Sequence, residues 1–153
     1  MLEPDGSVDW FDARQTTALL ALTSPLHRAR LEAALASGER RVAAAFRRVR
    51  TENGVKVQRL ELRLDGLAGC LRTPSGGSSR QYVLVCDAGE IRARRLTGRE
   101  TARLMGLPES YRLPPSESAA LKLMGDAVAV PVVRALAEGL LAPALKPRAG
   151  IAA

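Results

Sequence analysis

Arginine is the residue type in this sequence best suited to chemistry with a partner. The 153 residues hold 23 basic side chains, of which only Lys56, Lys122 and Lys146 are lysine, and the net charge is +7 with a pI near 10.4. The planar guanidinium binds a phosphate or the edge of a guanine through two hydrogen bonds at once. This balance favours a polyanionic partner, although an Ala- and Arg-rich composition is also what a GC-rich genome produces.

Arginines and hydroxyl groups gather around one glycine- and serine-rich stretch. Residues 66–80 read GLAGCLRTPSGGSSR. The small hydroxyls and backbone N–H groups of such a loop suit phosphate contacts, and its arginines can reach base edges. The residues expected to contact nucleic acid here and on the strand before it are Arg59, Arg72, Thr73, Ser78, Ser79 and Arg80. The alternatives are an ordinary surface loop and a solvated charged strand.

Cysteine and histidine usage argues against a metal site. His27 is the only histidine, and no cysteine or second histidine lies near it at ligand spacing. The two cysteines, Cys70 and Cys86, are unpaired in sequence and no secretory leader is visible, which predicts a cytoplasmic protein. We also expect no apolar run long enough to span a membrane.

Helices are expected to position the start of the chain. Asp12 and Gln15 have the spacing of a capping box, and Ser24 can cap a second helix whose first position is Pro25. The sequence therefore predicts a helical hairpin over residues 12–37.

Strands are expected to position the arginines. Residues 51–54 read TENG, a hairpin-turn signal, so residues 41–50 and 55–64 are predicted to pair, although residues 40–50 also fit a helical face. The apolar alternation shifts by one residue after Val57, which predicts a β-bulge near Gln58 and Arg59. Residues 81–86 and 90–94 are expected to form a second pair of strands.

Short helices are predicted beyond residue 94. Thr97 and Glu100 form a capping box for a helix that ends near Gly106, and a second helix fits residues 116–124. Pro131 suits the first turn of a third helix. On that helix one apolar stripe is formed by Val132, Leu136 and Leu140, with Val133, Ala137 and Leu141 beside it. Residues 142–153 are expected to be a flexible tail.

Two blocks in this region form a long, ordered pattern. Residues 94–111 contain Arg-x-Leu-Thr-x-Arg-Glu followed by Arg-Leu-Met-Gly-x-Pro-x-x-Tyr, and residues 125–132 read Gly-Asp-x-Val-x-Val-x-Val. The sequence resembles the C-terminal part of the DNA (cytosine-5)-methyltransferases, whose last two conserved motifs have these patterns. Asp126 stands where the family usually has Asn, and Cys70-Leu71 stands where it usually has Thr-Leu.

The resemblance implies an α+β fold in which residues 1–93 form a target-recognition domain and residues 94–141 carry the terminal motifs. In the family that last segment completes a Rossmann-like methyltransferase domain. The resemblance adds Arg94 and Arg99 to the expected DNA contacts and implies that S-adenosylmethionine is contacted by Gly125, Asp126, Ala127 and Val128. Double-stranded DNA is the implied partner.

The family's catalytic parts are missing from these 153 residues. The family uses a Pro-Cys nucleophile, a Phe-x-Gly-x-Gly cofactor loop and a Glu-Asn-Val motif, whereas Cys70 follows Gly69 and Cys86 follows Val85. Residues 52–54 read ENG and fall in the predicted turn. We expect no catalytic residue in this chain, and no methyl transfer by the chain alone.

Three interpretations remain open. The chain is the recognition subunit of a split methyltransferase, completed by a catalytic chain that carries the missing motifs and the cofactor loop. Alternatively it is an inactive remnant of a truncated gene, or a free-standing basic DNA-binding module, for which no helix-turn-helix pattern is present. The first interpretation is preferred.

Overall fold

The structure, a computed structural model, describes residues 1–73 and 80–145. A 3₁₀ turn at Asp5–Ser7 leads to α1 (Ala13–Leu20) and α2 (Pro25–Ala36), then to β1 (Arg41–Glu52), β2 (Val55–Arg63), β3 (Gln81–Asp87) and β4 (Glu90–Arg95). Four more helical elements follow: α3 (Gly98–Leu104), α4 (Glu117–Asp126), α5 (Val130–Leu136) and α6 (Ala142–Leu145), with a π-helical turn at Ala137–Leu141. The predicted α+β class is confirmed.

The predicted helix caps are present. Asp12 accepts from Gln15 N at 2.6 Å while the Gln15 side chain accepts from Asp12 N at 3.0 Å, and Ser24 accepts from His27 N at 3.4 Å. Thr97 and Glu100 close the second capping box, with Thr97 Oγ1 accepting from Glu100 N at 3.2 Å. These bonds satisfy backbone N–H groups that the first helical turn leaves without partners.

The four strands form one antiparallel sheet in the order β2-β1-β3-β4. The β1–β2 turn has positive φ at Asn53 (51°) and Gly54 (79°), as the turn signal requires. The predicted bulge is wrong, because the β1–β2 register runs unbroken from Ala44↔Arg63 to Glu52↔Val55. The apolar alternation shifts because Val55 and Leu60 lie on opposite faces of the sheet. Leu60 is buried, whereas Val55, next to the β1–β2 turn, is 63% exposed.

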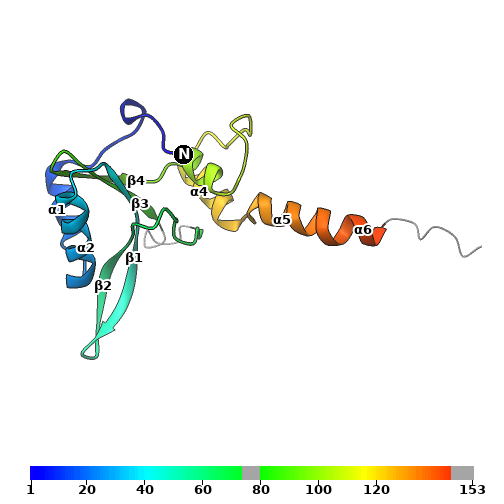
Figure 1. Cartoon of the computed structure of the whole chain (residues 1–153). Coiled ribbons are helices and arrows are strands. Elements are labelled where there is room, and N and C mark those ends of the chain that lie inside the picture. The colour runs from blue at the N-terminus through cyan, green and yellow to red at the C-terminus, as the bar shows by residue number, and fades with distance from the viewer. Residues whose placement is uncertain (74–79, 146–153) are drawn as a thin grey trace, which may run out of the picture.

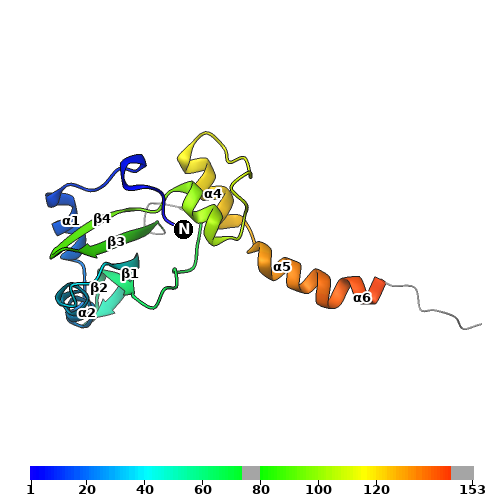
Figure 2. The ribbon, with the colours of Figure 1, turned by 45° about the horizontal axis from the view of Figure 1, so that its top comes forward.

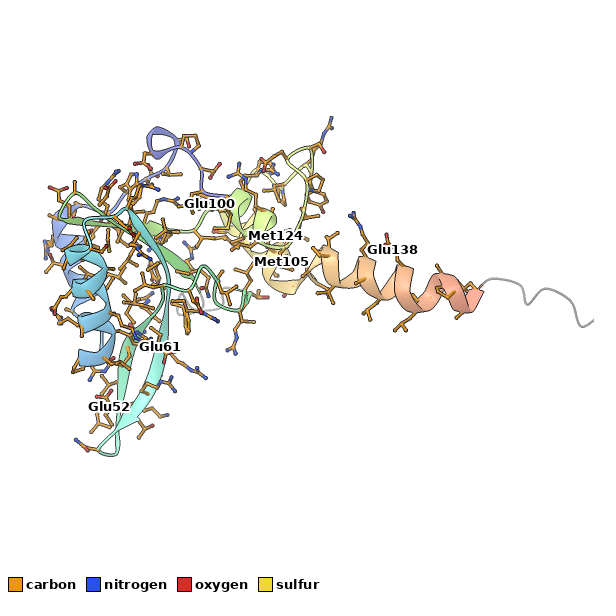
Figure 3. All side chains as sticks on the ribbon, viewed as in Figure 1. Glu52, Glu61, Glu100, Met105, Met124 and Glu138 are labelled. Atoms are coloured by element: carbon orange, nitrogen blue, oxygen red, sulfur yellow. The ribbon has the colours of Figure 1, made fainter. Side chains whose placement is uncertain are left out.

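Helices α1 and α2 cover one face of the sheet (Figure 1). The core between these helices and the sheet is mainly aliphatic and also holds Tyr82 and Cys86. Its aliphatic members are Leu19, Leu31, Ala43, Ala45, Leu60, Leu62 and Leu84. On the other face Val83, Val85 and Leu96 pack against Leu2, Trp10 and Leu104. Helices α3 and α4 share a third cluster, in which Met105 and Met124 meet (Figure 3).

The C-terminal helical segment leaves the body of the molecule. It projects away from the sheet and from α4 in two views (Figures 1 and 2). Its apolar side chains are half or more exposed: Val132 54%, Val133 50%, Leu136 50%, Leu140 63% and Leu141 59%. Within the expected tail, α6 continues the helix to Leu145, and residues 146–153 lie outside the described residues.

The membrane expectation also needs correction. Residues 117–145 contain an 18-residue window of mean hydropathy 1.6, long and apolar enough by composition alone to cross a membrane. The backbone is not one continuous helix there, because α4 ends at Asp126 and α5 begins at Val130.

Candidate nucleic-acid interface

The segment of residues 70–73 is held in place from both sides. On the sheet side, Gln81 Nε2 donates to the carbonyl oxygen of Cys70 at 3.2 Å. On the helix side, Leu71 packs against the cluster of Ala102, Met105 and Met124. The side chain between these anchors, Arg72, is exposed. The fold therefore presents this arginine on a fixed backbone.

A basic groove runs beside that segment. A cavity of about 300 Å³ is lined by Phe46, Arg47, Arg48, Val49, Cys70, Arg72 and Gln81. The β1–β2 ribbon, residues 41–63, and residues 70 and 72 of the glycine-rich stretch thus line the same groove. Three guanidinium groups and no carboxylate line this groove, but Arg48 Nη1 lies 3.8 Å from Glu61 Oε2 and Arg47 Nη1 donates to Gln58 Oε1 at 3.4 Å. The exposed Arg72 is the lining guanidinium that best suits phosphate and base edges. Phe46 and Gln81 are lining residues that the sequence did not single out.

Arg59 is less available than its position suggests. Its Nε donates to Glu52 Oε1 at 2.7 Å, and the same hydrogen bond lowers the pKa of Glu52 below 4.5. Arg50 and Arg63 are likewise engaged, by Glu61 and Asp65. The ribbon arginines thus largely neutralise carboxylates of the ribbon itself, so a DNA contact by Arg59 would have to compete with an ion pair.

Arg80 lies at the end of the glycine-rich stretch and is not one of the residues that line the groove. It lines a cavity of about 550 Å³ together with Trp10, Arg95, Thr97 and Glu117, among others. It also shares a small cleft with Arg72 and Gly125. Thr73 is described and half-buried, whereas Ser78 and Ser79 lie outside the described residues.

Arg94 is not a surface residue. Its side chain is 1% exposed, and Nη1 and Nη2 donate to the two carboxylate oxygens of Glu100 at 2.7 and 2.6 Å. Burial raises the pKa of Glu100, but hydrogen bonds from Arg94 and from the backbone N–H groups of Glu3 and Thr97 outweigh it and hold the pKa below 4.5. Arg94 therefore joins β4 to α3, and we withdraw it from the DNA contacts. Glu100, which the sequence marked only as a cap, is its partner.

Arg99 lies on the first turn of α3, outside the groove. Its Nη2 donates to the carbonyl oxygen of Tyr111 at 2.9 Å, across the loop that follows the helix. Arg99 therefore supports the loop that follows α3, and its contact with DNA stays a prediction.

The residues expected at the cofactor form an exposed turn. Gly125 and Asp126 end α4, and Ala127 and Val128 lead into α5, with Val128 64% exposed. The turn is fixed from behind, since Val130 N donates to the carbonyl oxygen of Met105 at 2.8 Å. Asp126 Oδ1 accepts a hydrogen bond from Thr73 Oγ1. Such a turn can form one wall of a cofactor site, while the rest would have to come from elsewhere.

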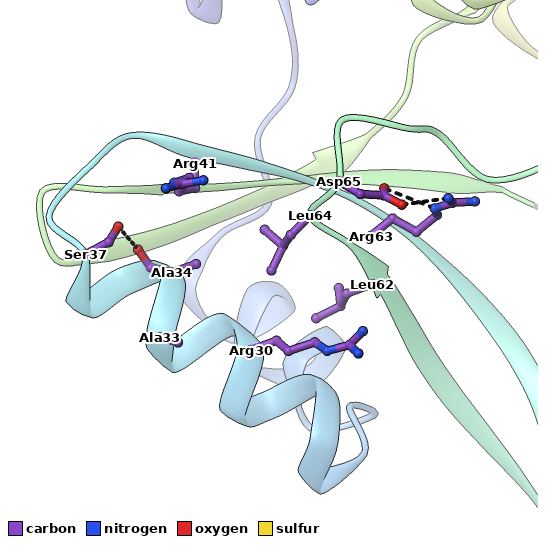
Figure 4. Close-up of a pocket in the computed structure, with 9 residues that line it drawn as sticks. All are labelled: Arg30, Ala33, Ala34, Ser37, Arg41, Leu62, Arg63, Leu64 and Asp65. Atoms are coloured by element: carbon purple, nitrogen blue, oxygen red, sulfur yellow. Dashed lines mark hydrogen bonds and ion pairs between the residues drawn. The ribbon is translucent and has the colours of Figure 1, made fainter.

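One further cavity is lined by none of the predicted site residues. A cavity of about 570 Å³ between α2 and β2 is lined by Arg30, Arg41 and Arg63 among others, and Arg63 pairs there with Asp65 (Figure 4). Arg41 pairs with Glu39, which does not line the cavity. Within residues 1–73 and 80–145 no group of three His, Cys, Asp or Glu side chains could hold a metal ion.

Comparison with known proteins identifies the family. The model of the C-5 cytosine-specific DNA methylases matches residues 33–142. The Type II methyltransferase M.HpaII of Haemophilus parainfluenzae is 36% identical over 92 residues, half of this chain and 25% of the relative. M.NlaX of Neisseria lactamica is 45% identical over 70 residues (42% of this chain, 22% of the relative), and M1.ScrFI of Lactococcus lactis subsp. cremoris is 48% identical over 48 residues (31% and 12%).

The matched region spans a quarter or less of the length of these relatives. No solved structure matches the chain. The family model covers well over half of the 153 residues, including both terminal motifs and the arginine groove. The chain therefore belongs to the C-5 cytosine-specific DNA methylase family.

Proposed function

We propose that this chain is the DNA-recognition part of a cytosine-5 methyltransferase. It contributes to transfer of a methyl group from S-adenosylmethionine to cytosine C5 only when a separate catalytic chain supplies the Pro-Cys nucleophile, the Phe-x-Gly-x-Gly loop and the Glu-Asn-Val motif. The observation that carries the proposal is the groove lined by Arg47, Arg48 and Arg72, in a chain whose residues 33–142 match the family model.

Within that groove Arg72 is the strongest candidate for a base contact. It is exposed, its backbone is anchored on both sides, and Phe46 lies nearby as an apolar surface. Arg80 is the second candidate, and Thr73, Ser78 and Ser79 are proposed to supply hydroxyl groups for the phosphate backbone. In this proposal residues 1–93 carry recognition and residues 94–141 carry the terminal motifs.

The turn of residues 125–128 is proposed as this chain's share of the cofactor site. S-Adenosylmethionine carries hydroxyl and ammonium groups, which the Asp126 carboxylate can accept hydrogen bonds from. Because the turn is exposed and open, the catalytic chain has to enclose the cofactor.

Duplex binding as a function of salt tests the DNA-recognition role. We expect weak binding whose affinity falls steeply as salt rises, because phosphate contacts release counterions. Arg72→Ala and Arg80→Ala should each weaken binding by about 1–3 kcal/mol if the arginine reads a base. Arg28→Ala is the matched control, since Arg28 is an exposed arginine on α2, outside the groove. Binding that does not change with salt, with Arg72→Ala or with Arg80→Ala would contradict the proposal.

Two other functions are kept as alternatives. An inactive gene remnant would bind no catalytic chain, and a free-standing DNA-binding module would bind DNA but support no methylation. The exposed apolar surface of α5 and its continuation favours a partner over both alternatives, because such patches mark interaction sites. This surface consists of Val132, Val133, Leu136, Leu140 and Leu141.

A further inference from the structure

We infer that Gly125 and Asp126 position the arginine segment of residues 70–73 on the DNA-facing groove. This inference rests on the proposed DNA-recognition function. It gives a second role to residues that the family resemblance connects only with the cofactor, and it names them as positioning residues for Arg72.

The first observation is how closely the two segments approach. A Cβ atom added at Gly125 would lie 2.5 Å from the carbonyl carbon of Arg72 and 2.6 Å from the Cα of Thr73, whereas real Cβ contacts stay above 3.0 Å. The atoms in the way are backbone atoms, which cannot rotate aside as a flexible side chain can. Only glycine at position 125 lets the segment lie directly on the end of α4.

The second observation is a hydrogen bond between the same two segments. Thr73 Oγ1 donates to Asp126 Oδ1 across 53 residues of sequence. Thr73 follows Arg72 directly, so this bond fixes the backbone on the C-terminal side of the arginine. The carboxylate accepts and the hydroxyl donates, and an Asn side-chain carbonyl could accept the same bond.

The third observation is that the opposite end of the segment is also anchored, there by the side chains of Gln81 and Phe46. A Cβ at Gly69 would lie 2.8 Å from Gln81 Oε1 and 2.9 Å from Phe46 Cδ1, and Gln81 Nε2 holds the Cys70 carbonyl. The segment is thus fixed at both ends, and its one exposed long side chain is Arg72. Moving either end moves the guanidinium relative to the groove.

The test measures duplex affinity over a salt series for single and combined variants. Gly125→Ala must displace the segment, so we expect the loss seen for Arg72→Ala, roughly 5- to 150-fold, and no further loss when the two are combined. Because a base contact carries sequence discrimination, Gly125→Ala should reduce the preference among duplexes of different sequence as Arg72→Ala does, and should reduce it no further when Arg72 is already replaced. A role in overall stability alone would lower the folded fraction without changing that preference.

Conservative variants at the hydrogen bond provide the second arm. Thr73→Val and Asp126→Ala should weaken binding in the same manner, while Thr73→Ser and Asp126→Asn should restore it. These changes remove one side-chain bond at the surface, so they remain informative even if Gly125→Ala fails to fold. Gly139→Ala is the matched control, because no atom lies within 4 Å of a Cβ at that position.

The outcomes separate this inference from the proposed function. If Arg72→Ala weakens binding while Gly125→Ala, Thr73→Val and Asp126→Ala bind as wild type, the positioning role is refuted and DNA recognition stands. If Arg72→Ala itself binds as wild type, the arginine contact and the positioning role both fall.

Discussion

Replacing Arg94 by Met and Glu100 by Leu, singly and together, tests what holds the two halves of this chain together. The carboxylate of Glu100 accepts two hydrogen bonds from Arg94 and one each from the backbone N–H groups of Glu3 and Thr97, at 2.6–3.1 Å. One buried group therefore joins the N-terminal segment, β4 and the start of α3.

The magnitude follows from burial. Arg94 and Glu100 are 1% and 0% exposed, so removing one partner leaves the other charge buried and unpaired, which costs about 3–5 kcal/mol. For a chain of this size that loss lowers the melting temperature by roughly 6–20 °C. The double variant removes both charges, so it should lose clearly less than the sum of the single variants, with a coupling of about 2 kcal/mol or more. It should not regain full stability, because the N–H groups of Glu3 and Thr97 lose their acceptor.

Urea and thermal unfolding followed by circular dichroism measure these losses. Arg92→Met is the matched control, since Arg92 pairs with Asp5 but is half-exposed, and exposed pairs contribute about 1 kcal/mol or less. Single variants that lose under about 1 kcal/mol, or a double variant that loses the full sum, would refute the reasoning.

Three further predictions concern pH, the groove and the partner surface. Because the folded pKa of Glu100 lies below 4.5, its contribution is fully present above pH 4.5 and is lost as pH falls through the folded pKa, so melting temperatures at pH 7, 4.5 and 3 should fall less steeply in Glu100→Leu. Cys70 is exposed and lines the groove whereas Cys86 is buried, so maleimide should label Cys70 alone in the native chain, and duplex DNA should protect it; unprotected labelling at saturating DNA would contradict the groove assignment. Leu136→Asp should abolish capture of a catalytic chain in a pull-down, because it buries an unpaired charge, while Leu26→Asp on α2 should not; equal capture by both would rule out the terminal helix as the contact.

Local chemistry made much of the fold predictable. The capping boxes at Asp12 and Thr97, the turn at Asn53 and the start of α5 at Pro131 each depend on residues a few positions apart, so sequence spacing is enough to reveal them. The bulge was predicted wrongly because the shift in the apolar pattern was taken for a shift in strand pairing. The pairing is unbroken, and Val55 is instead an exposed apolar residue on the face opposite to Leu60.

The site was less predictable because its organising contacts are distant in sequence. A count of arginines cannot distinguish Arg94, which is buried beside Glu100, from Arg72, which is exposed. Nor does spacing show that Thr73 meets Asp126, or that Gly125 is glycine because a backbone lies against it. These distinctions depend on burial and long-range contacts, which only the folded chain provides.

Methyl transfer to DNA in a reconstituted system tests the central proposal most directly. Labelled S-adenosylmethionine and duplex DNA would be incubated with this chain, with a catalytic chain that carries the missing motifs but lacks its own matching region, and with both together. We expect labelled 5-methylcytosine only when both chains are present, and its loss when Leu136→Asp is used. Methylation by this chain alone, or equal methylation by the catalytic chain without it, would contradict the account.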